Sequence, residues 1–436
     1  MKNLFLSNPT LSTEVQQAVT EMGFEEATPI QARAIPYILA GRDIIGQAMT
    51  GTGKTCAYGI PAVDMVDQSM SSIQVLILCP TRELAVQVAE ELQAVSRFKK
   101  NVRVLPIYGG QSIDHQIMAL KRKPQIIVGT PGRVMDHMRR HTLKLANLKM
   151  LILDEADEML NMGFREDIDV ILPDLPAERQ TLLFSATMSP EIKEITKLYL
   201  REPEYILTIH KELTIPSIEQ YYIEVRDSSK LELLCRLIDA KNIRLGLVFC
   251  NTKKRVDELT LALQGRGYSA EALHGDMKQS ERTRVMTKFK QEKIDILVAT
   301  DVAARGIDVN NIEAVFNYDI PSDEEYYVHR IGRTARAGRK GISYSFVFGR
   351  DMYRLREIQK YTKTTILPMQ PPKIADIEEV KLDAAVKRVV TMLEAGGYAK
   401  YDRVIEKVLI EAPEATTLDV ASVLFKMAFG ELDRSY

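Results

Sequence analysis

The sequence is poor in cysteine, in net charge and in long apolar runs, and each shortage excludes a class of protein. It has 4 cysteines and no Cys-x-x-Cys pair, which argues against disulfides or a zinc site and favours free thiols in a reducing cytoplasm. No window approaches the roughly 18 apolar residues of a membrane span, and the apolar start is too short for a signal peptide. With a formal net charge of −1, any nucleic-acid site must be a local basic groove.

The composition is otherwise that of a globular protein long enough for two or three domains, with 45% hydrophobic and 27% charged residues. Apolar runs at residues 75–79, 102–105, 126–128, 150–153 and 181–184 alternate with helical patterns. This alternation predicts a doubly wound α/β fold with a parallel sheet. Polar residues follow the strand ends, where such sheets bind ligands.

The second half of the chain repeats the plan of the first. The run 247–253 resembles 76–82, and the run 296–300 resembles 126–130. In the first half, Thr81 and Thr130 are 49 residues apart, and in the second half the corresponding Thr252 and Thr300 are 48 residues apart. We interpret the repeat as a duplicated domain in which only the first copy carries a Gly-Lys-Thr loop. The second copy therefore serves another purpose than its own nucleotide site.

Residues 48–55 have the pattern of a phosphate-binding loop between a strand and a helix. Glycines let backbone N–H groups turn toward a phosphate, and the helix N-terminus adds positive charge there. Lys54 would reach the β- and γ-phosphates of ATP, and the Thr55 hydroxyl would bind Mg²⁺. Ala48 departs from the general pattern, which begins with glycine. A glycine-rich turn without function is the alternative.

Two carboxylates follow the apolar strand at 150–153. Asp154 would hold Mg²⁺, mostly through water, and Glu155 would activate the attacking water. Such pairs are common on solvated surfaces, but this one follows an apolar strand downstream of a phosphate loop. In the second copy, Arg333 and Arg336 would reach across to the γ-phosphate. Catalysis would then depend on closure of the two copies. The alternative is that these arginines are solvated or bind an acidic partner.

Together these motifs resemble those of the DEAD-box ATP-dependent RNA helicases of superfamily 2, over roughly residues 1–365. Residues 154–157 read Asp-Glu-Ala-Asp, residues 23–31 match the Q motif of the family, and the family also begins its phosphate loop with alanine. Ala335 stands where the family commonly has glycine. The resemblance implies two tandem RecA-like parallel-sheet domains, at residues 1–206 and 217–366, joined by a linker at 207–216.

The resemblance also implies a role for each motif residue. Several of these motifs, taken alone, would more often be a plain turn or an ordinary helix face. In the nucleotide site, Gln31 and Phe24 would contact adenine and Asp308 the ribose, beside Gly306, and the cradle would comprise Ala48, Thr50, Gly51, Thr52, Gly53, Lys54 and Thr55. His329 would join the catalytic residues Lys54, Asp154, Glu155, Arg333 and Arg336, and Ser185 and Thr187 would couple hydrolysis to RNA release. RNA would be gripped by Arg82, Gly110, Thr130, Arg133, Thr252, Gln279, Arg282 and Thr300.

A third region begins at three prolines between residues 368 and 372. Apolar stripes at 382–393, 404–409 and 420–428 predict three amphipathic helices, the first ended by Gly396 and Gly397. We predict a small all-α dimerisation module at 367–436, with a bundle docked on the second domain as the alternative. The segment resembles the dimerisation region of a Gram-positive cold-shock helicase of the same family, which implies a role in stress response.

The resemblance thus implies RNA-stimulated ATP hydrolysis coupled to domain closure and local unwinding of short RNA duplexes, in RNA remodelling, decay or ribosome assembly. The predicted cofactors are ATP and Mg²⁺. The predicted partners are RNA and a second copy of the chain, with RNA-decay enzymes or ribosomal precursors as further candidates and no membrane. The alternative is an ATP-gated RNA clamp or scaffold with little unwinding. The intact Glu155, Arg333 and Arg336 favour the enzyme, and the Q motif disfavours a DNA helicase.

Overall fold

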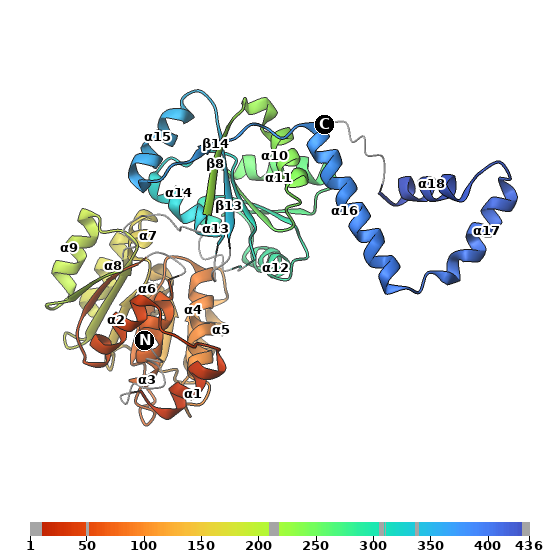
Figure 1. Ribbon diagram of the computed structural model, residues 1–436. Helices are drawn as coiled ribbons and strands as arrows, with labels where there is room; N and C mark the ends of the chain where they lie inside the picture. The colour runs from red at the N-terminus through yellow and green to blue at the C-terminus, as the bar shows by residue number, and fades with distance from the viewer. Residues whose placement is uncertain are drawn as a thin grey trace.

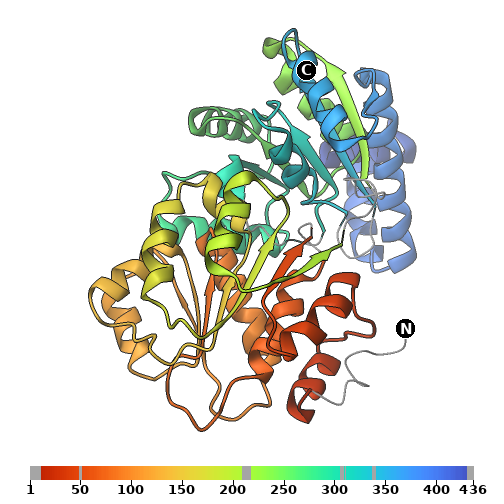
Figure 2. The same cartoon turned by 90° about the vertical axis from the view of Figure 1, so that its left-hand side faces the viewer.

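The computed structural model describes residues 11–48, 52–208, 218–304, 309, 311–335 and 340–429. Two parallel sheets with helices on both faces form two domains, and a run of helices follows them (Figure 1). Figure 2 shows the first domain below the second, with the C-terminal helices beside the second. The predicted fold class, two RecA-like domains and an all-α C-terminal region, is confirmed.

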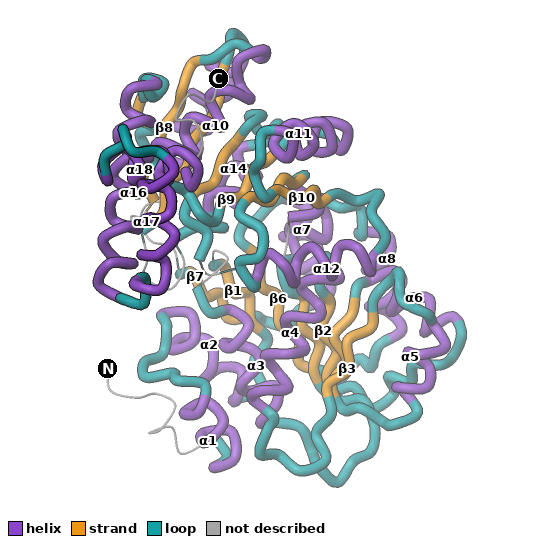
Figure 3. Tube along the Cα trace, turned by 90° about the vertical axis from the view of Figure 1, so that its right-hand side faces the viewer, coloured by secondary structure: helices purple, strands orange, loops and turns teal. Residues whose placement is uncertain are grey.

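The first sheet has seven strands in the order β3-β4-β2-β5-β6-β1-β7. Every residue of β2, β4 and β5 is buried, as expected for parallel strands covered on both faces, and Figure 3 shows these covering helices. The strands are β1 (Ile44–Gln47), β2 (Val75–Leu78), β3 (Val104–Ile107), β4 (Ile126–Gly129), β5 (Met150–Leu153), β6 (Gln180–Ser185) and β7 (Glu204–Leu207). The helices are α1 (Thr13–Glu21), α2 (Pro29–Leu39), α3 (Lys54–Asp64), α4 (Arg82–Val95), α5 (Ile113–Leu120), α6 (Pro131–Arg139), α7 (Ala156–Asn161), α8 (Arg165–Ile171) and α9 (Pro190–Tyr199).

The second sheet repeats this order strand for strand, as β10-β11-β9-β12-β13-β8-β14. The repeat confirms the predicted duplication, and β8 takes the place of β1. The strands are β8 (Ile218–Glu224), β9 (Gly246–Phe249), β10 (Ala270–Leu273), β11 (Ile296–Ala299), β12 (Ala314–Asn317), β13 (Gly341–Val347) and β14 (Leu367–Pro368). The helices are α10 (Lys230–Ala240), α11 (Lys253–Gly265), α12 (Gln279–Lys290), α13 (Asp301–Ala304), α14 (Glu324–Ile331) and α15 (Asp351–Thr362).

The C-terminal region consists of α16 (Ile374–Ala395), α17 (Asp402–Glu411) and α18 (Thr417–Phe429). Helix α16 packs against α10, whereas Figure 1 shows α17 and α18 leading away from both sheets. Gly396 and Gly397 have φ angles of 68° and 82° and end α16 as predicted. The three helices leave many apolar side chains exposed, among them Val386, Val390, Leu393, Val404, Val408, Leu418, Val423, Leu424 and Met427.

Two composition-based predictions concern the chain as a whole. All four cysteines are free and buried, as predicted. Among the described residues, no helix is both long enough and apolar enough to cross a membrane.

Strand β14 pairs with β8, so residues 367–368, which we expected in the C-terminal module, complete the second sheet.

Candidate functional site

The phosphate-binding loop connects β1 to α3. Gly53 has a φ angle of 88°, and a Cβ atom at this position would lie 2.5 Å from Gln31 Nε2, so only glycine fits. Lys54 is 6% exposed, and its Nζ atom has no hydrogen-bond partner among the described residues. A buried ammonium without a partner is costly, and a phosphate oxygen would satisfy it. This cradle therefore fits the phosphates of ATP. Thr50 and Gly51 lie outside the described residues.

Gln31 joins the Q motif to the phosphate loop. Its Oε1 atom accepts a hydrogen bond from Thr28 N at 2.9 Å, which caps α2, and its Nε2 atom donates to Gly53 O at 3.1 Å. Phe24 is half-buried and packs against the core of the first domain. Gln31 thus lies beside the loop. The contacts of Gln31 and Phe24 with adenine remain a prediction.

The two predicted catalytic carboxylates follow β5. Asp154 is 2% exposed, and burial raises the pKa of Asp154 to about 6, although the nearby Lys54 charge opposes the rise. Glu155 adopts the left-handed conformation, with a φ angle of 50°, at the start of α7. Such a strained backbone persists only where the surroundings hold it, and it is common at active sites. The structure thus brings Lys54, Asp154 and Glu155 into one buried site.

The segment 185–187 is tied to the same site through the last residue of the DEAD sequence. Asp157 Oδ2 accepts hydrogen bonds from Ala186 N at 2.9 Å and from Thr187 N at 2.8 Å. Ser185 Oγ donates to Thr187 O at 2.7 Å. A shift of α7 would therefore be felt by the end of β6, which is the connection that the predicted coupling requires.

Helix α14 of the second domain approaches this site across the domain boundary. His329 Nδ1 lies 3.4 Å from Glu158 Oε1, and burial lowers the pKa of His329 although Asp157 and Glu155 oppose the change. Arg333 is 3% exposed, and its Nε atom donates to His329 O at 3.2 Å. The predicted residues Gly306, Asp308 and Arg336 lie outside the described residues.

Arg330, also on α14, is a residue for which the motifs indicate no role. It is 1% exposed and forms two hydrogen bonds with the Asp301 carboxylate, at 2.5 and 2.7 Å. It also donates to Asn251 Oδ1 at 2.9 Å and lies over the Phe249 ring. Arg330 therefore anchors α14 to the strand ends on which Asn251 and Asp301 sit. The sequence signal was its place between His329 and Arg333.

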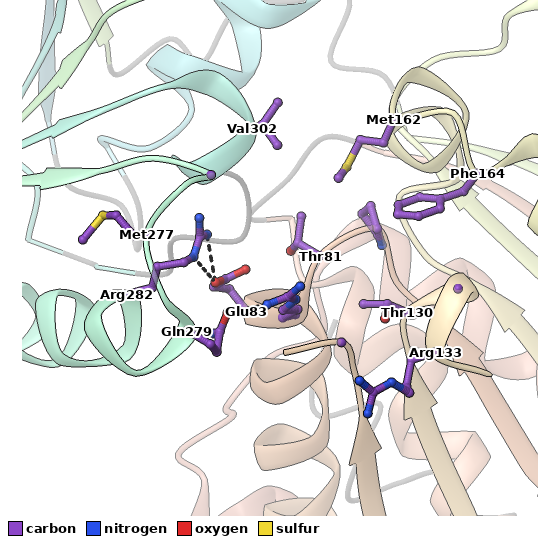
Figure 4. Close-up of a pocket in the computed structure, with 15 residues that line it drawn as sticks. Thr81, Glu83, Thr130, Arg133, Met162, Phe164, Met277, Gln279, Arg282 and Val302 are labelled. Atoms are coloured by element: carbon purple, nitrogen blue, oxygen red, sulfur yellow. Dashed lines mark hydrogen bonds and ion pairs between the residues drawn. The ribbon is translucent and has the colours of Figure 1, made fainter. Parts of the chain in front are cut away.

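A cavity of about 470 Å³ lies between the two domains (Figure 4). Five of the residues predicted to grip RNA line it, from both domains: Arg82, Thr130, Arg133, Gln279 and Arg282. Gly109, next to the predicted Gly110, lines it as well. Gly110 is instead packed against Arg82, and its φ angle of 85° requires glycine. Thr252 caps α11 by accepting from Arg255 N at 3.2 Å, and Thr300 is 9% exposed at the start of α13.

The two methionines that follow the DEAD sequence have different surroundings. Met159 is fully buried in the core of the first domain. Met162 instead lines the interdomain cavity, together with Phe164 (Figure 4). The reason is that α7 ends at Asn161, so the chain leaves the core before Met162. The cavity thus has an apolar wall facing its basic side.

Gln116 is a second residue that the sequence did not indicate. Its Oε1 atom accepts hydrogen bonds from Arg133 Nη1 at 2.9 Å and lies 3.0 Å from His137 Nε2, and its Nε2 atom donates to Tyr108 O at 3.0 Å. Gln116 is 2% exposed and His137 is fully buried. This network fixes Arg133 relative to the loop that contains Gly109. Only the tertiary structure places these residues together.

Polar pairs connect the domains across the cavity. Arg282 Nε and Nη2 both reach Glu83 Oε1, at 3.0 and 2.9 Å, and Figure 4 shows these two side chains pointing toward each other. Arg82 Nη1 donates to Gln279 Oε1 at 3.0 Å. Each pair joins residues on opposite domains, so it exists only while the domains are close together.

Replacing Glu83 with glutamine is therefore expected to weaken domain closure. The amide keeps the shape but loses the charge that Arg282 faces, which costs roughly 1.5 kcal/mol, or about tenfold in affinity for RNA in the presence of a non-hydrolysable ATP analogue. RNA affinity with ADP should change much less. Glu90→Gln, on the exposed side of the same helix, is the control. An equal loss in both nucleotide states would contradict a role in closure.

Comparisons with known proteins agree with this geometry. Residues 28–195 match the DEAD/DEAH box helicase family, residues 229–338 the helicase conserved C-terminal domain, and residues 372–434 the RNA helicase DeaD dimerization domain. Fold and site together thus define a helicase with two RecA-like domains and a dimerisation domain.

The chain belongs to the DEAD-box ATP-dependent RNA helicases and is an ATP-hydrolysing enzyme. It is 50% identical over 423 residues to the DEAD-box ATP-dependent RNA helicase CshA of Geobacillus kaustophilus, covering 97% of this chain and 90% of that protein. It is 49% identical over 425 residues to CshA of Listeria monocytogenes, covering 98% of this chain and 81% of that protein.

Two solved structures are similar to most of this chain. Dbp5 of S. cerevisiae bound to RNA and ADP BeF3 has a TM-score of 0.77 and 31% identity, covering 85% of this chain and 97% of that one. Mss116p bound to ssRNA and AMP-PNP has a TM-score of 0.79 and 26% identity, covering 92% of this chain and 87% of that one.

Proposed function

We propose that this helicase couples RNA-stimulated ATP hydrolysis to closure of its two domains, and that closure locally unwinds short RNA duplexes. The observation that carries the proposal is the approach of His329 and Arg333 to the site that holds Lys54 and Glu158. The first domain alone lacks these groups. Hydrolysis should therefore be fast only while α14 lies against the first domain.

In the nucleotide site, Lys54 would bind the β- and γ-phosphates, and Glu155 would orient and activate the attacking water. Gln31 and Phe24 would hold the adenine, and Arg333, with Arg336, would stabilise the charge that develops on the γ-phosphate. Ser185 and Thr187 would transmit the state of the site, since their segment is bonded to Asp157. Asp308 and Gly306 would complete the nucleotide contacts.

Mg²⁺ is the cofactor that fits the remaining donors. The described residues hold no cluster of three or more His, Cys, Asp or Glu side chains suited to a metal ion. Mg²⁺ is commonly held by one or two protein oxygens together with substrate phosphates and water, and Asp154 and Thr55 supply oxygens of this kind. The ion would neutralise phosphate charge. Asp154 and Thr55 would fix its place relative to Lys54.

RNA would lie in the interdomain cavity. Arg82, Thr130, Arg133, Gln279 and Arg282 line it or reach it, and cationic and hydroxyl groups of this kind bind phosphates without reading sequence. Gly110, Thr252 and Thr300 would extend the contacts. Because the cavity is made by both domains, RNA and ATP would each favour closure, which gives the mutual dependence expected of a coupled ATPase.

The deciding experiment measures ATP turnover with RNA, with DNA and without nucleic acid. We expect strong stimulation by RNA, weaker stimulation by DNA and unwinding of short RNA duplexes. Turnover that ignores RNA would overturn the proposal. RNA-stimulated turnover without strand separation would favour the alternative, an ATP-gated RNA clamp or assembly scaffold.

We also propose that the chain forms a homodimer through its C-terminal helices, as the dimerisation-domain match supports. Their exposed apolar side chains would be covered by a second copy. Light scattering should give the full chain twice the mass of one chain and a fragment 1–371, which retains β14, the mass of a monomer. The variant Val404→Lys/Val408→Lys should also be monomeric. If the full chain, the fragment and the variant all had the same number of chains per particle, dimerisation through these helices would be contradicted.

In the cell, we place this activity in the cytoplasm, in remodelling, decay or assembly of structured RNA, including under cold stress. Buried free thiols support a reducing compartment. RNA-decay enzymes and ribosomal precursors are the candidate partners. Co-purification with intact RNA and after nuclease treatment would separate direct protein partners from RNA-bridged ones.

A further inference from the structure

Tyr58 is a buried hydroxyl in the nucleotide site that none of the roles above uses. It lies on α3, one turn after Lys54, and is completely buried. Its Oη atom donates a hydrogen bond to Asp154 Oδ2 at 2.7 Å. The other carboxylate oxygen, Oδ1, accepts from Glu155 N at 3.0 Å. Among the described residues, these two donors hold the Asp154 carboxylate, one at each oxygen.

The ring of Tyr58 is itself held in place. Its centroid lies 5.2 Å from that of Phe184, with the two planes tilted by 52°. Phe184 is on β6, directly before Ser185. Tyr58 therefore contacts three parts of the site: the helix that starts with Lys54, the first DEAD carboxylate, and the strand that leads to the segment 185–187.

A buried tyrosine usually needs only some acceptor, and a backbone carbonyl is enough for its stability. Here the acceptor is the carboxylate expected to bind Mg²⁺ through water. A hydrogen bond to a charged group is shorter and stronger than a neutral one, so it restricts the rotation of the carboxylate about its own axis. Groups that orient a metal-binding side chain in this way tune the affinity for the metal.

We propose that Tyr58 is a positioning residue for the metal-binding carboxylate. Its hydroxyl fixes Asp154 in the orientation that leaves the rest of its acceptor capacity free for metal-bound water. The inference rests on the proposed Mg²⁺ role of Asp154. Tyr58 itself touches neither nucleotide nor metal. Its hydroxyl therefore lowers the Mg²⁺ concentration that nucleotide binding requires. It takes no part in the chemical step.

The test is Tyr58→Phe, which removes the hydroxyl and keeps the ring contact with Phe184. Fluorescent ADP is titrated at fixed protein over a range of Mg²⁺ concentrations and in EDTA. We expect unchanged affinity in EDTA and a half-saturating Mg²⁺ concentration about tenfold higher than in the parent protein, at the lower end of the effects of lost orienting partners. Tyr268→Phe is the matched control, since Tyr268 Oη donates to Asp239 Oδ1 at 2.9 Å in the second domain.

A second measurement separates positioning from stability. In an Asp154→Asn background, Tyr58→Phe should cause no further change in the Mg²⁺ requirement, because the hydroxyl acts through that carboxylate. An unchanged Mg²⁺ midpoint in Tyr58→Phe, or an equal shift in Tyr268→Phe, would overturn the inference and leave the proposed function intact. Parent protein whose ADP affinity ignored Mg²⁺ would overturn the metal proposal and the inference together.

Discussion

Replacing Arg333 with alanine is expected to lower RNA-stimulated ATP turnover by about 10³-fold or more. An arginine that stabilises the charge on a transferring phosphoryl group contributes on the order of 10³–10⁵ in rate. The structure supports this role because Arg333 is almost fully buried and its Nε atom is bonded to the backbone of His329, which faces Glu158 of the first domain. The measurement is kcat at saturating RNA and ATP.

Two further readouts accompany that substitution. ADP affinity should stay within a few-fold of the parent value, because the phosphate cradle belongs to the first domain. Arg354→Ala, an exposed arginine on α15, should leave turnover unchanged. A loss confined to KM, with kcat preserved, would show that Arg333 binds the ground state and does not act in hydrolysis.

Replacing Glu155 with glutamine is expected to reduce turnover by about 10²–10⁴-fold, the usual contribution of a positioned general base. The amide has nearly the same shape, so nucleotide and RNA binding should persist and the ATP-bound, RNA-bound form should accumulate. Single-turnover hydrolysis and RNA binding with ATP are the measurements. Glu166→Gln, an exposed carboxylate on α8, is the control. Full activity in Glu155→Gln would exclude Glu155 as the general base and would mean that another group activates the attacking water.

The sequence predicted the first sheet well because its strands are continuous apolar runs. Most predicted runs match β2, β4, β5 and β6 within a residue or two. Strand β3 begins at Val104, two residues later than predicted. The difference has a physical cause: it is an edge strand with a partly exposed middle, and Arg103 before it is engaged by the side chain of Gln125. At an edge, apolarity alone does not define where pairing starts.

The site was predictable where motifs carry it, and less so where tertiary contacts do. Lys54, Asp154 and Glu155 stand in ordered patterns, and the structure brings them together. Tyr58 and Gln116 do not, because their partners are 96 and 17 residues away and nothing local marks them. A residue whose role depends on a hydrogen-bond partner elsewhere in the chain has no sequence signature of its own.

The two sheets have the same strand order, and each is covered by apolar clusters that belong to its own half of the chain. Each half is therefore stabilised mainly by its own apolar core. The pairs that join the halves, such as Glu83 with Arg282, are polar. Calorimetry of the chain should then show two separable transitions for the halves. The proposed opening and closing of the two domains would therefore expose neither interior, so domain movement need not lower the resistance of each half to unfolding.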